Sequence, residues 1–96
     1  MPTIESIRDI VRDVACQHGV ERVFLFGSYA RGEAKPGSDI DLRIDEGQLT
    51  TLFRLGGFYA DLEERLSVPV DVVVTDSLTP NFLSRINKDE VILYER

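Results

Sequence analysis

Two aspartates separated by one apolar residue, Asp39 and Asp41, are the residues of this chain best suited to chemistry. They alternate with Ile40 and Leu42, which is the pattern of a β-strand, and residues i and i+2 of a strand share a face. The carboxylates therefore stand side by side, roughly 6–7 Å apart at the backbone. Like charges at that distance repel, so the pattern favours a cation between them. Mg²⁺ prefers such oxygen ligands and commonly also holds substrate phosphates.

A third carboxylate, Asp71, opens the valine-rich run 70–73, which is predicted to form the next strand. A carboxylate in such a strand is expected to have a cationic partner, because buried charges are normally paired or bound to metal. Three carboxylates on neighbouring parallel strands can clamp two divalent ions about 3.5–4 Å apart. Such a pair of ions stabilises the attacking and leaving oxygens of a displacement at phosphorus. Asp39, Asp41 and Asp71 are thus the candidate metal ligands and catalytic residues.

The pair Gly27-Ser28 follows an apolar run and is the candidate phosphate-binding turn. A glycine lets the backbone approach phosphate closely. Ser28 is expected to cap a short helical turn, whose first amides favour anions. Arg31 can contact phosphate or brace a carboxylate, and a simple ion pair with Glu33 or Asp39 is the alternative.

The elements that position these residues follow from the spacing of apolar residues. The expected order is helix, strand, turn, strand, helix, strand, helix, strand. A short connection makes the first two strands antiparallel, and a connecting helix makes the second and third parallel and right-handed. The fold class is α/β (α+β), a small mixed sheet with flanking helices in a single domain over residues 1–96. Helices are expected over 4–18, 49–66 and 80–87, a turn over 28–32, and strands over 23–26, 39–44, 70–75 and 91–94.

The sequence leaves alternative roles open for two features, the glycine pair 56–57 and Arg43. Gly56-Gly57 lies inside the predicted helix 49–66 and costs about 1 kcal/mol per glycine relative to alanine. A close backbone crossing or a kink would explain the pair. Arg43 shares a strand face with Asp39 and Asp41, where it can neutralise the site, contact phosphate or form a structural ion pair, and the ion pair is favoured.

Composition narrows the class of function. The net charge of −6 argues against a protein that grips long nucleic acids by their backbone. An acidic protein still handles nucleotides when a metal ion supplies positive charge. No apolar run approaches the roughly 20 residues that cross a bilayer. The lone Cys16 and the absence of a signal-like N-terminus predict a cytoplasmic protein.

Gly27-Ser28, a gap of ten residues and then Asp39-Ile40-Asp41 resembles the signature of the DNA polymerase beta-like nucleotidyltransferases. The runs 26–32 and 38–42 resemble its minimal nucleotidyltransferase (MNT) branch, and the likeness extends over essentially the whole chain. The resemblance implies transfer of a nucleoside monophosphate from a triphosphate such as ATP to a hydroxyl, with two Mg²⁺ ions. It implies that Asp39 and Asp41 hold both metals, that Asp71 holds the catalytic one, and that Gly27 and Ser28 hold the triphosphate.

Small members that resemble this chain are commonly antitoxins, which pair with a helical HEPN ribonuclease toxin and adenylylate one of its tyrosines. The resemblance therefore implies a hetero-oligomer with such a toxin. Two alternatives stay open: an antitoxin that neutralises its partner by binding alone, and an adenylyltransferase acting on a small molecule such as an antibiotic. The missing second domain counts against the small-molecule enzyme. Nucleotide preference and the identity of the catalytic base are also open.

Overall fold

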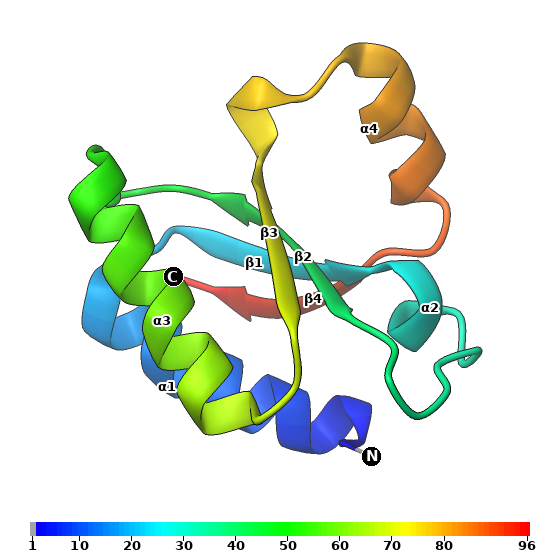
Figure 1. Cartoon of the computed structure of the whole chain (residues 1–96). Coiled ribbons are helices and arrows are strands. Elements are labelled where there is room, and N and C mark those ends of the chain that lie inside the picture. Colours follow the sequence, from blue (N-terminus) through cyan, green and yellow to red (C-terminus); the bar gives the residue numbers. More distant parts are fainter. Residues whose placement is uncertain (1) are drawn as a thin grey trace.

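The computed structural model describes residues 2–96, and these residues form one four-stranded sheet with helices on both sides (Figure 1). The strand order is β3-β2-β1-β4. The elements are α1 (Ile4–His18), β1 (Arg22–Phe26), α2 (Gly27–Ala30), β2 (Ile40–Asp45), α3 (Leu52–Leu66), β3 (Val70–Val74), the 3-10 turn η1 (Thr75–Ser77), α4 (Pro80–Asn87) and β4 (Val91–Glu95). Within residues 2–96, no helix is long and apolar enough to span a bilayer.

The strand directions agree with the sequence-based expectation. β1 pairs antiparallel with both β2 and β4, and β2 pairs parallel with β3. The core lies between one face of this sheet and the helices α1 and α3, whose buried residues pack against alternate residues of β2 (Figure 1). Ile40, Leu42 and Ile44 of β2 are fully buried in it. The intervening residues, Asp41 and Arg43, therefore point to the opposite face, where α4 lies.

Local capping signals explain where α1 begins and ends. The Thr3 side chain accepts a hydrogen bond from the Ser6 amide, and the Ser6 hydroxyl accepts one from the Thr3 amide. Gly19 ends the helix in the left-handed region, at φ 72°. The expected bounds of 4–18 are therefore confirmed, and both caps depend on residues only a few positions apart.

The expected start of α3 was wrong, and its end at residue 66 was confirmed. The helix begins at Leu52 instead of residue 49, because the Thr51 side chain caps it by accepting the amide of Arg54. Leu49 is buried but lies in the preceding loop, while Leu52 and Phe53 are 87% and 90% exposed. The buried stripe is instead formed by residues at a spacing of four: Phe58, Leu62 and Leu66.

The glycine pair of α3 serves no close crossing. α3 runs as one helix through Gly56 and Gly57. A Cβ on Gly56 would meet no other described atom within 4 Å, and one on Gly57 would lie 3.6 Å from Cε1 of His18, an ordinary contact. The pair therefore carries only the entropic cost of glycine in a helix.

We expect Gly56→Ala to raise the free energy of unfolding by about 0.5–1 kcal/mol, because alanine loses less backbone entropy than glycine in a helix. Urea denaturation of the purified chain measures this change. Gly37→Ala is the matched control, since that site is equally open but has φ 92°, so the substitution there should lower stability. A Gly56→Ala variant less stable than the native chain would show that the glycine has a packing role.

Candidate functional site

Asp41 lies at the centre of the candidate site, between two neighbouring strands. The parallel register of β2 and β3 places Asp71 directly beside it, and the antiparallel register of β1 and β2 places Phe26 on its other side. Asp41 is half-buried, whereas Asp39 and Asp71 are exposed. The sheet thus brings Asp71 to the pair as predicted, although β2 begins at Ile40 and Asp39 precedes the strand. The premise that Asp71 is a buried charge was wrong, because its strand lies at the edge of the sheet.

The three carboxylates are close enough to affect one another electrostatically. Burial raises the pKa of Asp41 above its usual value, and the charges of Asp71 and Asp39 raise it further. The positive charge of Arg31 opposes these effects and lowers the pKa of Asp41. Ionised Asp41 is therefore short of positive charge, which is the condition that a bound divalent cation relieves.

Gly27 contacts Asp41 so closely that no side chain fits at this position. Its φ of 76° lies in the left-handed region, and a Cβ built there would collide with Oδ2 of Asp41. The close contact at Gly27 is with the carboxylate of Asp41. The expected approach of its backbone to phosphate stays a prediction. The sharp turn between β1 and α2 needs glycine for both reasons.

Ser28 lies inside α2 and is not its cap, contrary to the expectation from the sequence. The helix begins one residue earlier, at Gly27, and Phe26 occupies the N-cap position without a side-chain hydrogen bond. The left-handed glycine turn makes this earlier start possible. The first amides of α2 therefore have no side-chain acceptor at the cap, and they lie beside the Gly27–Asp41 contact.

Arg31 follows α2 and forms the local ion pair that was one of its predicted alternatives. Its Nε donates to Oε2 of Glu33 at 3.1 Å, and both side chains are exposed. Because it also lowers the pKa of Asp41, Arg31 contributes positive charge to the site. An exposed pair of this kind is weak, so Glu33 can release Arg31 to an anion.

The carboxylate oxygens of the candidate site are chemically suited to Mg²⁺. Within residues 2–96, no three aspartate, glutamate, histidine or cysteine side chains are gathered closely enough to hold a metal ion in the arrangement shown. Asp39, Asp41 and Asp71 nevertheless supply the hard carboxylate oxygens that Mg²⁺ prefers, at one end of the β2–β3 pair. Their mutual repulsion, seen at Asp41, is the electrostatic feature that fits a cation.

A cavity of about 270 Å³ adjoins the glycine turn and was not predicted from the sequence. It lies between α2 and α4, and Phe26 and Phe82 meet edge to face beside it, with ring centroids 6.4 Å apart. Local sequence patterns contain no signal for this cavity, because α4 is more than 50 residues away from α2 along the chain. Its lining consists of Phe26, Gly27, Arg31, Phe82, Arg85, Ile86 and Asp89.

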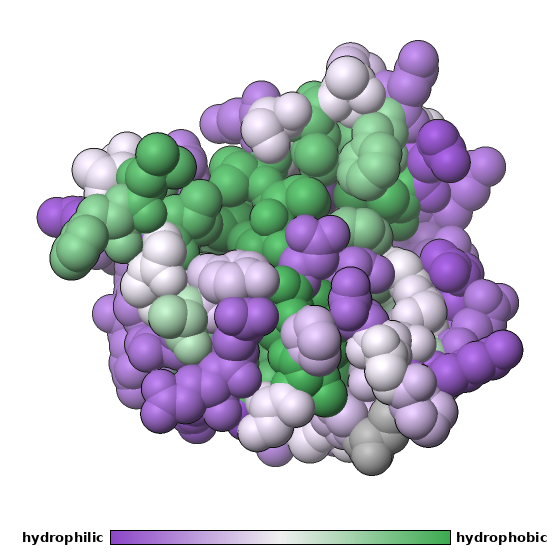
Figure 2. All heavy atoms as spheres, viewed as in Figure 1, coloured by the Kyte–Doolittle hydropathy of each residue, from purple (hydrophilic) through white to green (hydrophobic). Residues whose placement is uncertain are grey.

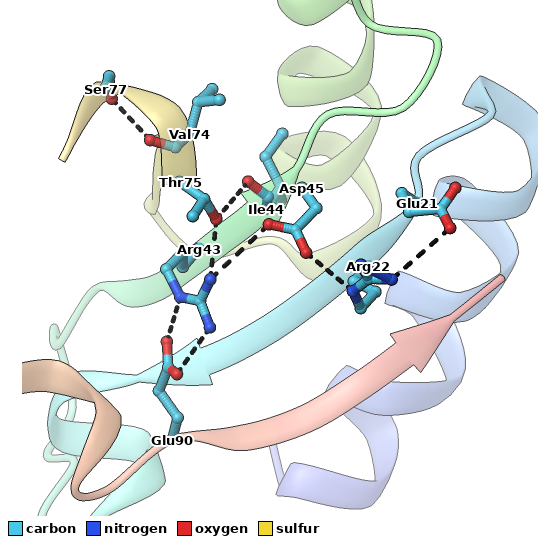
Figure 3. A network of polar contacts seen from close by, with 9 residues as sticks. All are labelled: Glu21, Arg22, Arg43, Ile44, Asp45, Val74, Thr75, Ser77 and Glu90. Carbon is cyan, nitrogen blue, oxygen red and sulfur yellow. Dashed lines mark hydrogen bonds and ion pairs between the residues drawn. The ribbon is translucent and has the colours of Figure 1, made fainter. Parts of the chain in front are cut away.

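Arg43 forms the structural ion pair favoured from the sequence. Its guanidinium forms two hydrogen bonds with Glu90 and one with Thr75 (Figure 3). The guanidinium carbon also lies 4.0 Å from the ring centroid of Phe24. The hydrogen bond to Glu90 raises the pKa of Arg43, and burial opposes it. Arg43 is thus committed to protein contacts on the face that carries Asp41.

Known proteins are similar to this chain in sequence. A family model described as a nucleotidyltransferase domain matches residues 5–94. A "putative protein adenylyltransferase" of Methanocaldococcus jannaschii is 38% identical over 88 residues, which cover 92% of this chain and 95% of the relative. The protein adenylyltransferase MntA of Thermococcus cleftensis is 32% identical over 95 residues, 95% of this chain and 96% of the relative.

Solved structures agree. A structure described as a "putative minimal nucleotidyltransferase" aligns with a TM-score of 0.80 and 32% identity, over 94% of this chain and 95% of that one. A complex of a tri-AMPylated HEPN toxin with an MNT antitoxin, from Shewanella oneidensis, contains a chain that aligns with a TM-score of 0.74. That alignment covers 98% of this chain and 74% of the other at 16% identity, and shows the fold alone. The chain belongs to the nucleotidyltransferase domain family, among its minimal, protein adenylyltransferase members.

Proposed function

We propose that this enzyme transfers AMP from ATP to a tyrosine hydroxyl of a HEPN-type ribonuclease toxin and so acts as its antitoxin. The observation that carries the proposal is the position of Asp41, which lies beside Asp71 in register and in contact with Gly27. These contacts support one site in which the carboxylates would hold metal ions and the glycine turn would hold phosphates. The names of the relatives, protein adenylyltransferases, support a protein as the acceptor.

The roles of the residues follow from their places in the site. Asp39 and Asp41 would hold two Mg²⁺ ions and Asp71 one of them, and these ions would neutralise phosphate charge during displacement at phosphorus. Gly27, Ser28 and Arg31 would hold the triphosphate. The tyrosine oxygen bonds to the α-phosphorus while the bond from that phosphorus to the bridging oxygen breaks, which releases pyrophosphate. Asp71, which is exposed, would accept the hydroxyl proton.

The test is the intact mass of the purified partner toxin after incubation with this protein, ATP and Mg²⁺. We expect a gain equal to one or more AMP groups, mapped to tyrosine by peptide mass spectrometry. An ATP analogue with a methylene group between the α- and β-phosphates is the control, because its bond cannot be broken. An unchanged mass of a folded cognate toxin would contradict the proposal.

A second candidate, neutralisation by binding alone, is favoured by an exposed apolar surface. Leu52 and Phe53 at the start of α3 are almost fully exposed, and Figure 2 shows apolar residues extending from there towards α4. Such patches commonly mark protein interaction sites. An Asp39→Asn/Asp41→Asn variant that still silenced the toxin would favour binding alone, and loss of silencing with retained binding would favour catalysis.

A further inference from the structure

One buried guanidinium group holds both ends of the segment that carries α4. The chain leaves the sheet after β3 at Thr75 and returns to it after Glu90, at the start of β4 (Figure 3). Arg43 donates from Nε and Nη2 to the two carboxylate oxygens of Glu90, at 2.5 and 2.8 Å. Its Nη1 donates to Oγ1 of Thr75 at 2.8 Å, and that hydroxyl donates to the carbonyl of Ile44 at 3.0 Å. We call Arg43, Glu90 and Thr75 the clamp.

The clamp is costly to bury, so stability alone does not explain it. The side chains of Arg43 and Glu90 are only 9% and 8% exposed. When the backbone is included, Arg43 is the one charged residue that is buried within the described part of the chain. Replacing a buried ion pair with apolar residues is often neutral or stabilising, because desolvation offsets the attraction between the charges. The bidentate pair supplies a fixed geometry, because a planar guanidinium donates to a carboxylate in few orientations.

α4 depends on this geometry because it has little core of its own. Its eight residues, all within the described part of the chain, include none that is buried. Its Phe82 ring packs edge to face against Phe26 of β1. A helix without buried residues takes its position mainly from the points at which its two ends join the sheet. Those points are the residues that Arg43 binds.

α4 forms one wall of the cavity next to the candidate site. Phe82 and Arg85 face Gly27 and Arg31 across that cavity. We propose that Arg43 is a positioning residue for nucleotide binding: through Glu90 and Thr75 it holds α4 at the distance from α2 at which the cavity accepts part of the ATP molecule. The inference rests on the proposed function, because it takes ATP as the ligand of this cavity.

The first test is direct binding of a fluorescent ATP analogue in the presence of Mg²⁺, which needs no partner toxin. Arg43→Lys keeps the charge and removes the bidentate geometry. We expect it to weaken binding of the analogue by about tenfold, the loss typical when a residue that orients a binding site is removed. Arg65→Lys is the matched control, because Arg65 is an exposed arginine that pairs with Asp13 and makes no contact with the clamp. The control should bind as the native chain does.

Glu90→Gln and Thr75→Val are smaller changes that keep the shape of the clamp and test it if Arg43→Lys folds poorly. Both should raise the KM for ATP several-fold and leave kcat nearly unchanged, because they move a binding wall and no reacting group. Hydrogen exchange should become faster in α4 and stay unchanged in α1, since only α4 is released.

Two results separate the hypotheses. If the native chain binds no nucleotide, the proposed function is wrong. If the native chain binds nucleotide and the folded clamp variants bind it equally well, the proposed function stands and the positioning role of Arg43 is refuted. Equal acceleration of exchange in all elements would likewise refute it, because it would show a purely structural role.

Discussion

Asp41→Asn should abolish AMP transfer while making the metal-free protein more stable at neutral pH. Asparagine keeps the shape of the side chain but removes a negatively charged ligand. Metal ions contribute several kcal/mol to displacements at phosphorus, and 1.36 kcal/mol is tenfold in rate, so we expect a loss of about a thousandfold or more. Transfer to the partner toxin, followed by intact mass over time, measures it.

The gain in stability follows from the raised pKa of Asp41. Because burial and the charges of Asp71 and Asp39 raise this pKa in the folded state, the folded protein binds the proton more tightly than the unfolded chain. Stability is therefore lost as pH rises from the usual value of 3.8 through the raised value, and ionised Asp41 remains a cost at neutral pH. Asparagine carries no such cost.

Thermal denaturation in a chelating buffer checks this result. Asp41→Asn should have the higher Tm at pH 7, and its advantage should disappear as pH falls below 3.8, where the native carboxyl is protonated in both states. Asp13→Asn is the matched control, since Asp13 lies on α1, on the other side of the sheet, and forms an ion pair with Arg65. It should keep transfer and gain no stability. Transfer that survives Asp41→Asn would remove Asp41 from the catalytic site.

Gly27→Ala should damage both the fold and the site. A residue with a Cβ in the left-handed region costs about 1–2 kcal/mol, and Gly27 has φ 76°. The new methyl group would also collide with Oδ2 of Asp41 and displace that carboxylate. Displacement of a catalytic group by about 1 Å can cost on the order of a hundredfold, so we expect a loss of transfer of this size.

Gly32→Ala separates the two causes. Gly32 has nearly the same φ, 73°, but a Cβ there would meet no other described atom within 4 Å. Both variants should lose stability in urea denaturation, Gly27→Ala the more because of its collision with Asp41, and only Gly27→Ala should lose transfer by about a hundredfold. Equal losses of transfer would show that backbone strain, and not contact with Asp41, explains the need for glycine.

The sequence determined the features that depend on near neighbours or on strand periodicity. The bounds of α1 and the strand that holds Asp41 between buried Ile40 and Leu42 were predicted correctly. The lengths of the connections also predicted the directions of the strands, because a short link favours an antiparallel pair and a helical link a parallel one. These directions were enough to bring Asp71 to Asp41.

Only the tertiary structure decided which groups share a space. The contact of Gly27 with Asp41, the half-burial of Asp41 beside exposed Asp71, and the solvent-facing start of α3 depend on how the elements pack. The pair of Arg43 with Glu90 joins residues 47 positions apart, and the cavity joins α2 to α4. Local patterns carry no information on such distances, since they arise from packing energies summed over the whole chain. The sequence by itself thus predicted that Asp71 lies beside Asp41, and the fold alone placed α4 beside the glycine turn.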